Sequence, residues 1–347
     1  MNQATSQASH ILWAADWRID MHVLITGGAG MIGRKLTARL CKNKSLNNQP
    51  IDRLTLMDVV APEMPAGFLG KTDLVAADLS APGVADRVIS QNPDIIFHLA
   101  AIVSGEAETD FEKGYRVNLQ GTHLLIEAIR RRGGGYRPKF VFTSSIAVFG
   151  APFPDSITDE FQRTPLTSYG TQKAICELLL ADYTRKRFLD GVGIRLPTIV
   201  VRPGKPNKAA SGFFSSIIRE PLAGQEAVLP VREDVQHWFA SPRTAIDFLT
   251  HAVSLSPEQL GPRINISMPG ICCTVAEQIA ALKRVASHAV ASRIRREPDE
   301  LVIRIVAGWP NRFDARHAIA LGFKADASFD NIIRNHIDDE MGGNFIA

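Results

Sequence analysis

The chain has 347 residues, of which 45% are hydrophobic and 22% charged, and its formal net charge is +3. These values are ordinary for a globular protein and leave room for one large α/β domain or two joined lobes. The small charge and the lack of a long basic block exclude a nucleic-acid partner. The longest apolar run, Ile95–Val103, is too short to cross a membrane, so no membrane partner is expected.

Four cysteines are present, and none has the spacing of a zinc site. Their small number does not predict a disulfide framework, so we expect a protein of the reducing cytoplasm without a metal. Residues 1–20 lack the basic and apolar regions of a secretory signal. We expect this segment to be a dispensable N-terminal extension, because the first predicted strand begins at Met21.

The segment Met21–Leu40 predicts a buried strand, a glycine turn and a helix. Its three glycines have the spacing G-x-x-G-x-x-G, and apolar residues recur at helical spacing after them. Such a turn lets backbone N–H groups and the positive end of a helix dipole approach a pyrophosphate. The residues expected around the phosphates are Gly27, Gly30, Met31, Ile32 and Gly33.

Asp58 ends the next predicted strand, Arg53–Asp58, at about the distance from the glycine turn that dinucleotide-binding folds require. A carboxylate at this place accepts hydrogen bonds from the adenosine ribose hydroxyls and repels a 2′-phosphate. The sequence therefore predicts NAD, rather than NADP, as the cofactor. Ala100, near the end of the predicted strand Asp94–Ala101, is expected beside the cofactor.

Strands and helices alternate along the first two hundred residues, which predicts a doubly wound parallel sheet of the Rossmann type. The later strands are expected at Asp73–Asp78, Lys139–Ser145 and Gly193–Arg202, and the long helices at Asp110–Arg132 and Thr167–Leu189. This alternation is lost after Gly204. We predict an NAD-binding domain at 21–203 and a smaller C-terminal α/β substrate lobe at 204–347, with 236–261 returning to the first domain.

Tyr169 and Lys173 are four residues apart on a predicted helix and therefore share one face. A lysine ammonium and the positive nicotinamide ring both favour the phenolate, so this pairing predicts a lowered tyrosine pKa and a general base. Ser145 ends a predicted strand, where its hydroxyl could hydrogen-bond the reacting oxygen. Ser144 beside it is expected either to contact the substrate or to support the site residues.

The motifs GGAGMIG, FTSSIAVFG and SYGTQK resemble those of extended short-chain dehydrogenases/reductases. The resemblance covers Met21 to about Phe323 and implies that Ser145, Tyr169 and Lys173 are catalytic. It also implies a homodimer. The further residues that it implies for NAD binding are Asp78, Leu79 and Pro203, together with Tyr169 and Lys173.

Within this family, residues 195–231 resemble dehydrogenases that oxidise a small 2-hydroxy sugar acid, such as D-erythronate, at C2 with NAD. Such a substrate needs a cation for its carboxylate. The candidates are Lys205, Asn207 and Arg243, and the residues alone do not choose among them.

A nucleoside-diphosphate-sugar epimerase is the alternative activity. The family pattern places an arginine and an aspartate where this chain has Gln236 and Arg243, which weakens that alternative. A non-catalytic NAD-binding regulator is the third possibility, but it would not need the serine, tyrosine and lysine together.

Overall fold

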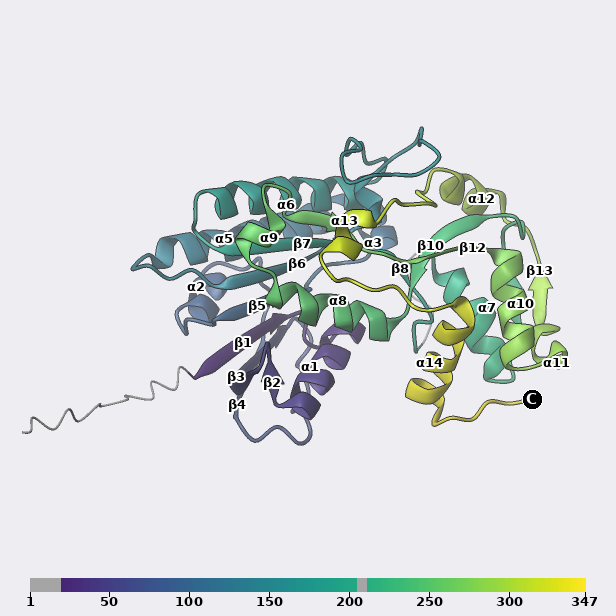
Figure 1. Cartoon of the computed structure of the whole chain (residues 1–347), viewed down its shortest axis with the longest axis horizontal. Helices are drawn as coiled ribbons and strands as arrows, with labels where there is room; N and C mark the ends of the chain where they lie inside the picture. Colours follow the sequence, from purple (N-terminus) through teal and green to yellow (C-terminus); the bar gives the residue numbers. More distant parts are fainter. Residues whose placement is uncertain (1–19, 205–210) are drawn as a thin grey trace, which may run out of the picture.

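An eight-stranded sheet forms the centre of the larger lobe in this computed structural model, which describes residues 20–204 and 211–347 (Figure 1). Its order is β11-β7-β6-β5-β1-β3-β2, with β4 also paired to β3. The pairings are parallel except that of β2 with β3. The strands are β1 (Met21–Thr26), β2 (Ser45–Leu46), β3 (Gln49–Asp58), β4 (Lys71–Ala76), β5 (Ile95–His98), β6 (Lys139–Ser145), β7 (Asp190–Leu196) and β11 (Asn265–Ser267).

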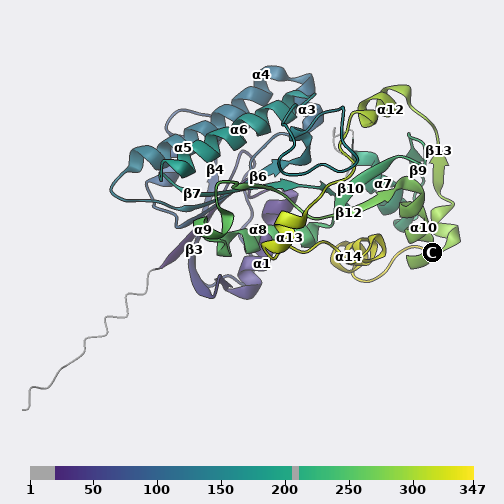
Figure 2. The same cartoon turned by 45° about the horizontal axis from the view of Figure 1, so that its top comes forward.

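Helices cover both faces of this sheet, which confirms the doubly wound parallel fold. On one face α1 packs against α8, and on the other α5 lies beside α2 and α6 (Figure 2). The six residues of β1 are all buried, as expected for a central strand between two helical layers. Leu36 and Leu40 of α1 are fully buried one turn apart and fix that helix on the sheet.

The helices of the larger lobe are α1 (Met31–Asn43), α2 (Val84–Ile89), α3 (Ser104–Thr109), α4 (Phe111–Gly114), α5 (Gly121–Arg132), α6 (Ser168–Arg185), α8 (Pro242–Ser254) and α9 (Pro257–Leu260). A 3₁₀ turn, Ile146–Val148, follows β6. The long helix expected over Asp110–Arg132 is wrong in detail, because a π-helical segment, Tyr115–Gln120, separates α4 from α5. That wider turn buries Asn118, whose amide donates to Gln172 of α6 at 2.7 Å.

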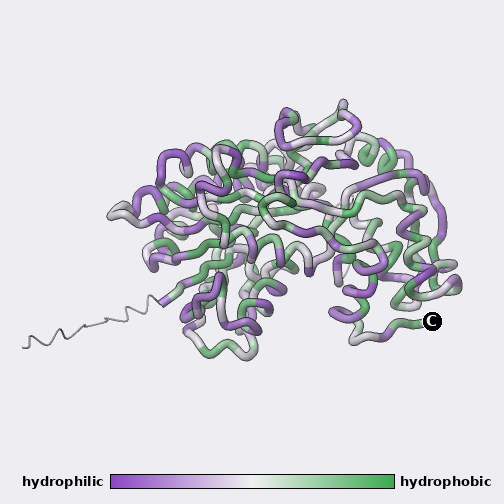
Figure 3. The backbone as a smooth tube through the Cα atoms, viewed as in Figure 1, coloured by the Kyte–Doolittle hydropathy of each residue, from purple (hydrophilic) through white to green (hydrophobic). Residues whose placement is uncertain are grey.

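The smaller lobe contains two short sheets with a hydrophobic core of their own. Its strands are β8 (Thr198–Ile199), β9 (Ala227–Leu229), β10 (Gln236–Ala240), β12 (Ile271–Thr274) and β13 (Ile294–Arg296), ordered β12-β10-β8 and β13-β9. Its helices are α7 (Gly212–Leu222), α10 (Val275–Val285), α11 (His288–Ala291), α12 (Glu300–Ala307) and α14 (Phe329–Met341), whereas α13 (Arg316–Ala320) contacts β11 and packs in the core of the larger lobe. Hydrophobic stretches line the interior of both lobes in the hydropathy view (Figure 3).

The chain passes between the two lobes more than once. The strand expected over Gly193–Arg202 is split, since β7 belongs to the large sheet while β8 pairs with β10 in the smaller one. Val200 already packs in the second core. Further along, α8 packs on β6 and β7, and β11 adds the last strand beside β7. The division at 203/204 stays a prediction.

In the part of the chain that the structure describes, no helix is both long and apolar enough to span a membrane. Residues 1–19, most of the expected N-terminal extension, lie outside that part.

Candidate active site

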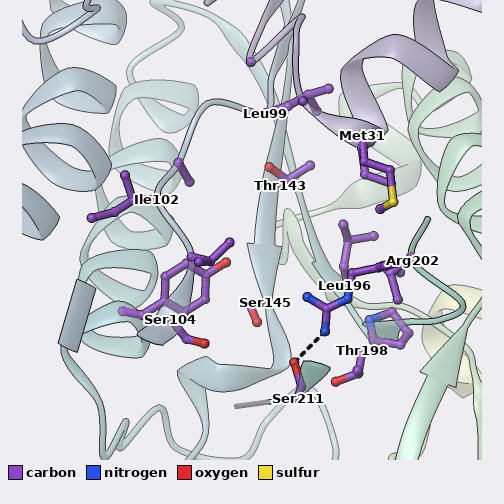
Figure 4. A pocket seen from close by; sticks show the side chains of 18 of the residues that line it. Met31, Leu99, Ile102, Ser104, Thr143, Ser145, Leu196, Thr198, Arg202 and Ser211 are labelled. Carbon is purple, nitrogen blue, oxygen red and sulfur yellow. Dashed lines mark hydrogen bonds between the residues drawn. The ribbon is translucent and has the colours of Figure 1, made fainter. Parts of the chain in front are cut away.

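A cavity of about 420 Å³ lies at the carboxyl ends of the large sheet, between the glycine turn and α7 (Figure 4). A second hollow of about 430 Å³ continues from it towards α12, and both share Ser145, Tyr169 and Thr198. The predicted residues that line the first cavity are Gly27, Gly30, Met31, Ile32, Gly33, Ser144, Ser145, Tyr169, Lys173 and Pro203. Predicted residues from four separate segments of the sequence are therefore brought together.

The glycine turn has the shape of a phosphate cradle. Gly27 has φ +77°, and a Cβ there would lie 2.8 Å from the backbone nitrogen of Ala100. A Cβ on Gly33 would lie 2.2 Å from the carbonyl oxygen of Gly27, so only glycine lets α1 begin so close to β1. No side chain caps the N-terminus of α1 among the described residues, which leaves its first N–H groups facing the cavity. The cradle fits a pyrophosphate.

Asp58 lies beside this turn at the end of β3. Its Oδ2 accepts a hydrogen bond from the backbone N–H of Ala29 at 3.0 Å, which ties the strand end to the turn. Asp78 and Leu79 follow β4. Burial opposes the ionisation of Asp78, but two hydrogen bonds from Ser80 and the charge of Arg116 outweigh it and lower the carboxyl pKa. Asp58 and Ala100 lie against the glycine turn, and neither they nor Asp78 and Leu79 line the cavity itself.

Ser145 and Tyr169 both line the cavity. Thr167 caps α6 by accepting from the backbone N–H of Gly170 at 3.1 Å, and this fixes the helix start just before Tyr169. Ser145 ends β6, and its Oγ accepts from the backbone N–H of Ala147 at 3.1 Å. Burial raises the pKa of Tyr169 to about 12, although a hydrogen bond from Ser145 and the charge of Arg202 oppose this rise.

The Lys173 ammonium lies under the tyrosine, 5.7 Å from the centre of its ring. It donates a hydrogen bond to the carbonyl oxygen of Thr143 at 2.8 Å, and burial lowers its pKa to about 8. The ammonium faces that carbonyl and does not offset the burial of Tyr169. The expectation of a lowered tyrosine pKa is therefore wrong for the protein alone.

Ser144 makes a contact that favours the supporting one of its two predicted roles. Its hydroxyl donates to Oε1 of Glu177 at 2.6 Å, and Glu177 is completely buried. Because a serine has one proton to donate, that proton points away from the cavity. We therefore withdraw Ser144 as a substrate contact and regard it as a support for the end of β6.

Arg243 was expected as a candidate carboxylate clamp, and the structure places it elsewhere. Its Nε and Nη2 donate to the Asp339 carboxylate at 2.8 and 2.6 Å, and its Nη1 donates to Asn335 at 2.8 Å. These bonds join α8 to α14, and Arg243 lines neither hollow. Lys205 and Asn207 lie outside the described residues.

Arg202 is the cavity residue that the sequence reasoning missed. Its Nη2 donates to Oγ of Ser211 at 2.7 Å, and Figure 4 shows its guanidinium pointing into the space near Ser145 and Thr198. The sequence placed Arg202 at the end of a continuous strand, so the turn that aims it into the cavity was not foreseen. Its place directly before Pro203-Gly204 was the available signal, since such a pair ends a strand.

Comparison with known proteins identifies the family of the chain. The model of the NAD-dependent epimerase/dehydratase family matches residues 23–239. The chain is 48% identical to a D-erythronate dehydrogenase of Cupriavidus necator, over 92% of this chain and 98% of that protein. It is 44% identical to a D-erythronate dehydrogenase of Haemophilus influenzae, over 92% of this chain and 100% of that one.

A solved structure, titled as the nucleoside-diphosphate-sugar epimerase from Agrobacterium tumefaciens, is 61% identical, with a TM-score of 0.92 and coverage of 93% of this chain and 95% of that one. An L-threonine dehydrogenase from Cupriavidus necator, at 22% identity and a TM-score of 0.79, covers 92% of this chain and 99% of its own and shows the shared fold alone. The chain therefore belongs to the NAD-dependent epimerase/dehydratase family, and it is an oxidoreductase whose cofactor is NAD.

Proposed function

We propose that this enzyme oxidises a small 2-hydroxy sugar acid, D-erythronate, to 2-keto-D-erythronate in the cytoplasm. The observation that carries the proposal is the similarity to two proteins of that name, which extends over 98% and 100% of their lengths. The convergence of Ser145, Tyr169 and Lys173 on one cavity supports it, since a binding protein without catalysis would not need all three.

The residues proposed to hold NAD are those of the cradle and its surroundings. The N–H groups at the start of α1 face the pyrophosphate, and Asp58 accepts from the adenosine ribose. Lys173 holds the nicotinamide ribose. The other proposed contacts come from Gly27, Gly30, Met31, Ile32, Gly33, Asp78, Leu79, Ala100, Tyr169 and Pro203. When bound, NAD supplies the acceptor for the hydride that leaves C2 of the substrate.

Tyr169 is the proposed base. Its phenolate oxygen takes the proton of the C2 hydroxyl while the C2–H bond breaks with both of its electrons, and the C2–O bond becomes a carbonyl. Ser145 donates a hydrogen bond to the same oxygen and steadies its developing negative charge. Because the pKa of Tyr169 is about 12 in the protein alone, nearby positive charge must lower it. The charge of Arg202 acts in that direction, and the positive nicotinamide ring of bound NAD would add to it.

The epimerisation of a nucleoside-diphosphate sugar is the second candidate. The solved structure with 61% identity is titled as such an epimerase, and this observation favours it. Against it, Gln236 stands in β10 where the family pattern has the arginine for a diphosphate.

One assay separates the two candidates. The purified full chain is mixed with NAD and a panel of four-carbon and five-carbon aldonates, and NADH is followed by its absorbance. We expect steady NADH production with D-erythronate and none with Tyr169→Phe. If the protein instead interconverted a UDP-sugar without net NADH production and ignored every aldonate, the epimerase would replace the dehydrogenase.

We also propose that the enzyme is a homodimer that associates through α5 and α6. These helices lie side by side on the outer face of the large sheet, and Leu178 of α6 is 56% exposed there (Figure 2). Light scattering after size-exclusion chromatography should give twice the chain mass of 38.0 kDa. A monomer at micromolar concentration would contradict this.

A further inference from the structure

Arg202 is a half-buried cation that faces the cavity without an acidic partner. Among residues 20–204 and 211–347, its side-chain hydrogen bond goes to the neutral hydroxyl of Ser211, and no carboxylate forms an ion pair with it. Burial and the neighbouring charge of Arg219 both lower the pKa of Arg202, and the group that opposes them is the Tyr169 phenol rather than a carboxylate. A partly buried guanidinium without an acidic partner is stabilised most by an anionic group of a bound ligand.

The position of Arg202 in the same cavity as the Ser145 and Tyr169 hydroxyls indicates which kind of anion it would bind. Arg202 and Tyr169 line the same cavity, and the charge of Arg202 is felt at the Tyr169 hydroxyl. In a 2-hydroxy acid the carboxyl carbon is bonded directly to the carbon that loses hydride. A carboxylate clamp must therefore lie beside the base. In a sugar nucleotide the phosphates are several bonds away from the reacting ring carbon, so their clamp would lie far from the base.

The backbone of Arg202 is held from two sides. Its N–H donates to Oγ of Ser215 at 3.1 Å, and its carbonyl oxygen accepts from Nη1 of Arg219 at 2.6 Å. Both partners belong to α7, so this helix fixes the base of the arginine side chain. Nη2 of Arg219 also forms an ion pair with Glu220. Arg219 is therefore a positioning residue for Arg202. Such pre-organisation lowers the entropy cost of binding a small ligand.

Two other cations are less suitable partners for a substrate carboxylate. Arg304 of α12 lines the outer hollow and is exposed to solvent. Arg243 is bound to Asp339 of α14.

We propose that Arg202 binds the substrate carboxylate, with Ser211 beside it, and so selects small 2-hydroxy acids against neutral polyols and sugar nucleotides. This inference rests on the proposed dehydrogenase function. Ser211 accepts a hydrogen bond from Arg202 and keeps its own hydroxyl proton, which it can donate to a carboxylate oxygen.

The test compares an acid with its neutral analogue. Wild type, Arg202→Gln, Arg202→Lys and the control Arg243→Gln are assayed with D-erythronate and with its uncharged amide. We expect Arg202→Gln to raise the KM for the acid roughly a hundredfold, because a buried charged partner is lost. Its KM for the amide should change little, so the preference for the acid disappears. Arg202→Lys should recover part of the preference, and Arg243→Gln should behave as wild type.

A binding measurement separates the substrate from the cofactor. NAD and NADH affinities are measured by fluorescence titration, and oxalate, a small dicarboxylate probe, is titrated into the NADH complex. Arg202→Gln should keep its NADH affinity within about twofold and lose the oxalate response.

Two results would overturn the inference. If Arg202→Gln lost NADH affinity and kept the KM for D-erythronate, the guanidinium would serve the cofactor phosphates instead. If all variants distinguished acid from amide equally well, another residue would bind the carboxylate, while the proposed dehydrogenase function would still stand. A wild-type enzyme that oxidises no aldonate would refute the proposed function and the inference together.

Discussion

Glu177 and Arg195 form a two-point ion pair, with Nε to Oε1 at 2.8 Å and Nη2 to Oε2 at 2.9 Å, and their side chains are 0% and 3% exposed. The same Oε1 accepts from Ser144, and Arg195 also reaches Asp159 at 3.2 Å. The pair joins the ends of β6 and β7 to α6, one helical turn beyond Lys173. The pair therefore holds β6, which carries Ser145, against α6, which carries Tyr169.

We predict that Arg195→Met lowers stability by about 3 kcal/mol or more, because it leaves the Glu177 carboxylate buried beside the weaker partner Arg163. The matched control is Arg263→Met, which breaks an exposed ion pair with Glu160 and should cost less than about 1 kcal/mol. Thermal melting of the three proteins measures the difference. Equal melting temperatures for both variants would contradict this account of the buried pair.

Gly33→Ala should destabilise the fold by roughly 1 to 3 kcal/mol and weaken NAD binding, since its Cβ would meet the Gly27 carbonyl oxygen at 2.2 Å. Gly121→Ala is the control, because its nearest neighbour atom lies 3.8 Å away and alanine favours a helix by up to about 1 kcal/mol. Melting curves with and without NAD measure both effects. A Gly33→Ala protein that binds NAD like the wild type would show that the turn adjusts.

Asp58→Ala should reduce the preference for NAD over NADP by at least about tenfold. A 2′-phosphate near this carboxylate meets a repulsion of about 1 to 4 kcal/mol at the protein surface. The ratio of the two dissociation constants, from fluorescence titration, is the measurement. Asp52→Ala is a useful control, because Asp52 accepts from the N–H of Met21, far from the carboxyl end of the strand. Equal affinity of the wild type for both cofactors would refute the role of Asp58.

Tyr169→Phe should lower kcat for D-erythronate by about a hundred- to ten-thousandfold, which is the usual effect of losing a general base. The ring keeps its packing, so the melting temperature and the affinity for NAD should change little. Ser145→Ala should cause a smaller loss, since it removes one hydrogen bond to the reacting oxygen. Turnover of Tyr169→Phe at the wild-type rate would rule out the mechanism.

Oxidation should speed up as the pH rises through the neutral range. The pKa of Tyr169 lies near 12 and its phenolate is the active form, so each added pH unit increases the fraction of active base. The rise should level off above about pH 8, because Lys173, with a pKa of about 8, then loses the charge with which it is proposed to hold the nicotinamide ribose. The dependence of kcat/KM on pH is the measurement, and a profile that is flat between pH 6 and 8 would be inconsistent with it.

The glycine turn and the meeting of Ser145, Tyr169 and Lys173 in one cavity could be predicted because their sequence signals are local. Gly27 and Gly33 flank a single turn that leads into a helix, and Tyr169 and Lys173 share one helix. The limits of β6 were predicted to the residue, because a short apolar run, Phe140–Phe142, is bounded by polar residues on both sides.

Features that depend on distant partners could not be predicted. Thr198 is not part of the large sheet, because it pairs with Phe239, about forty residues further along the chain. No local sequence pattern indicates this change of sheet. Because of this change of sheet, Arg202 points into the cavity. Arg243, which is equally basic, instead forms an ion pair with Asp339. The choice of clamp was therefore a question of tertiary structure.

The late return of β11 has a consequence for synthesis on the ribosome. β7 ends at Leu196. The strand that pairs with its outer edge, β11, begins only at Asn265, after β8, α7, β9 and β10 of the smaller lobe have been synthesised. Until then β7 is an open edge, with unpaired N–H and C=O groups that invite pairing with another chain. The nascent protein therefore passes through a stage in which that edge is open to pairing with other chains, before β11 covers it.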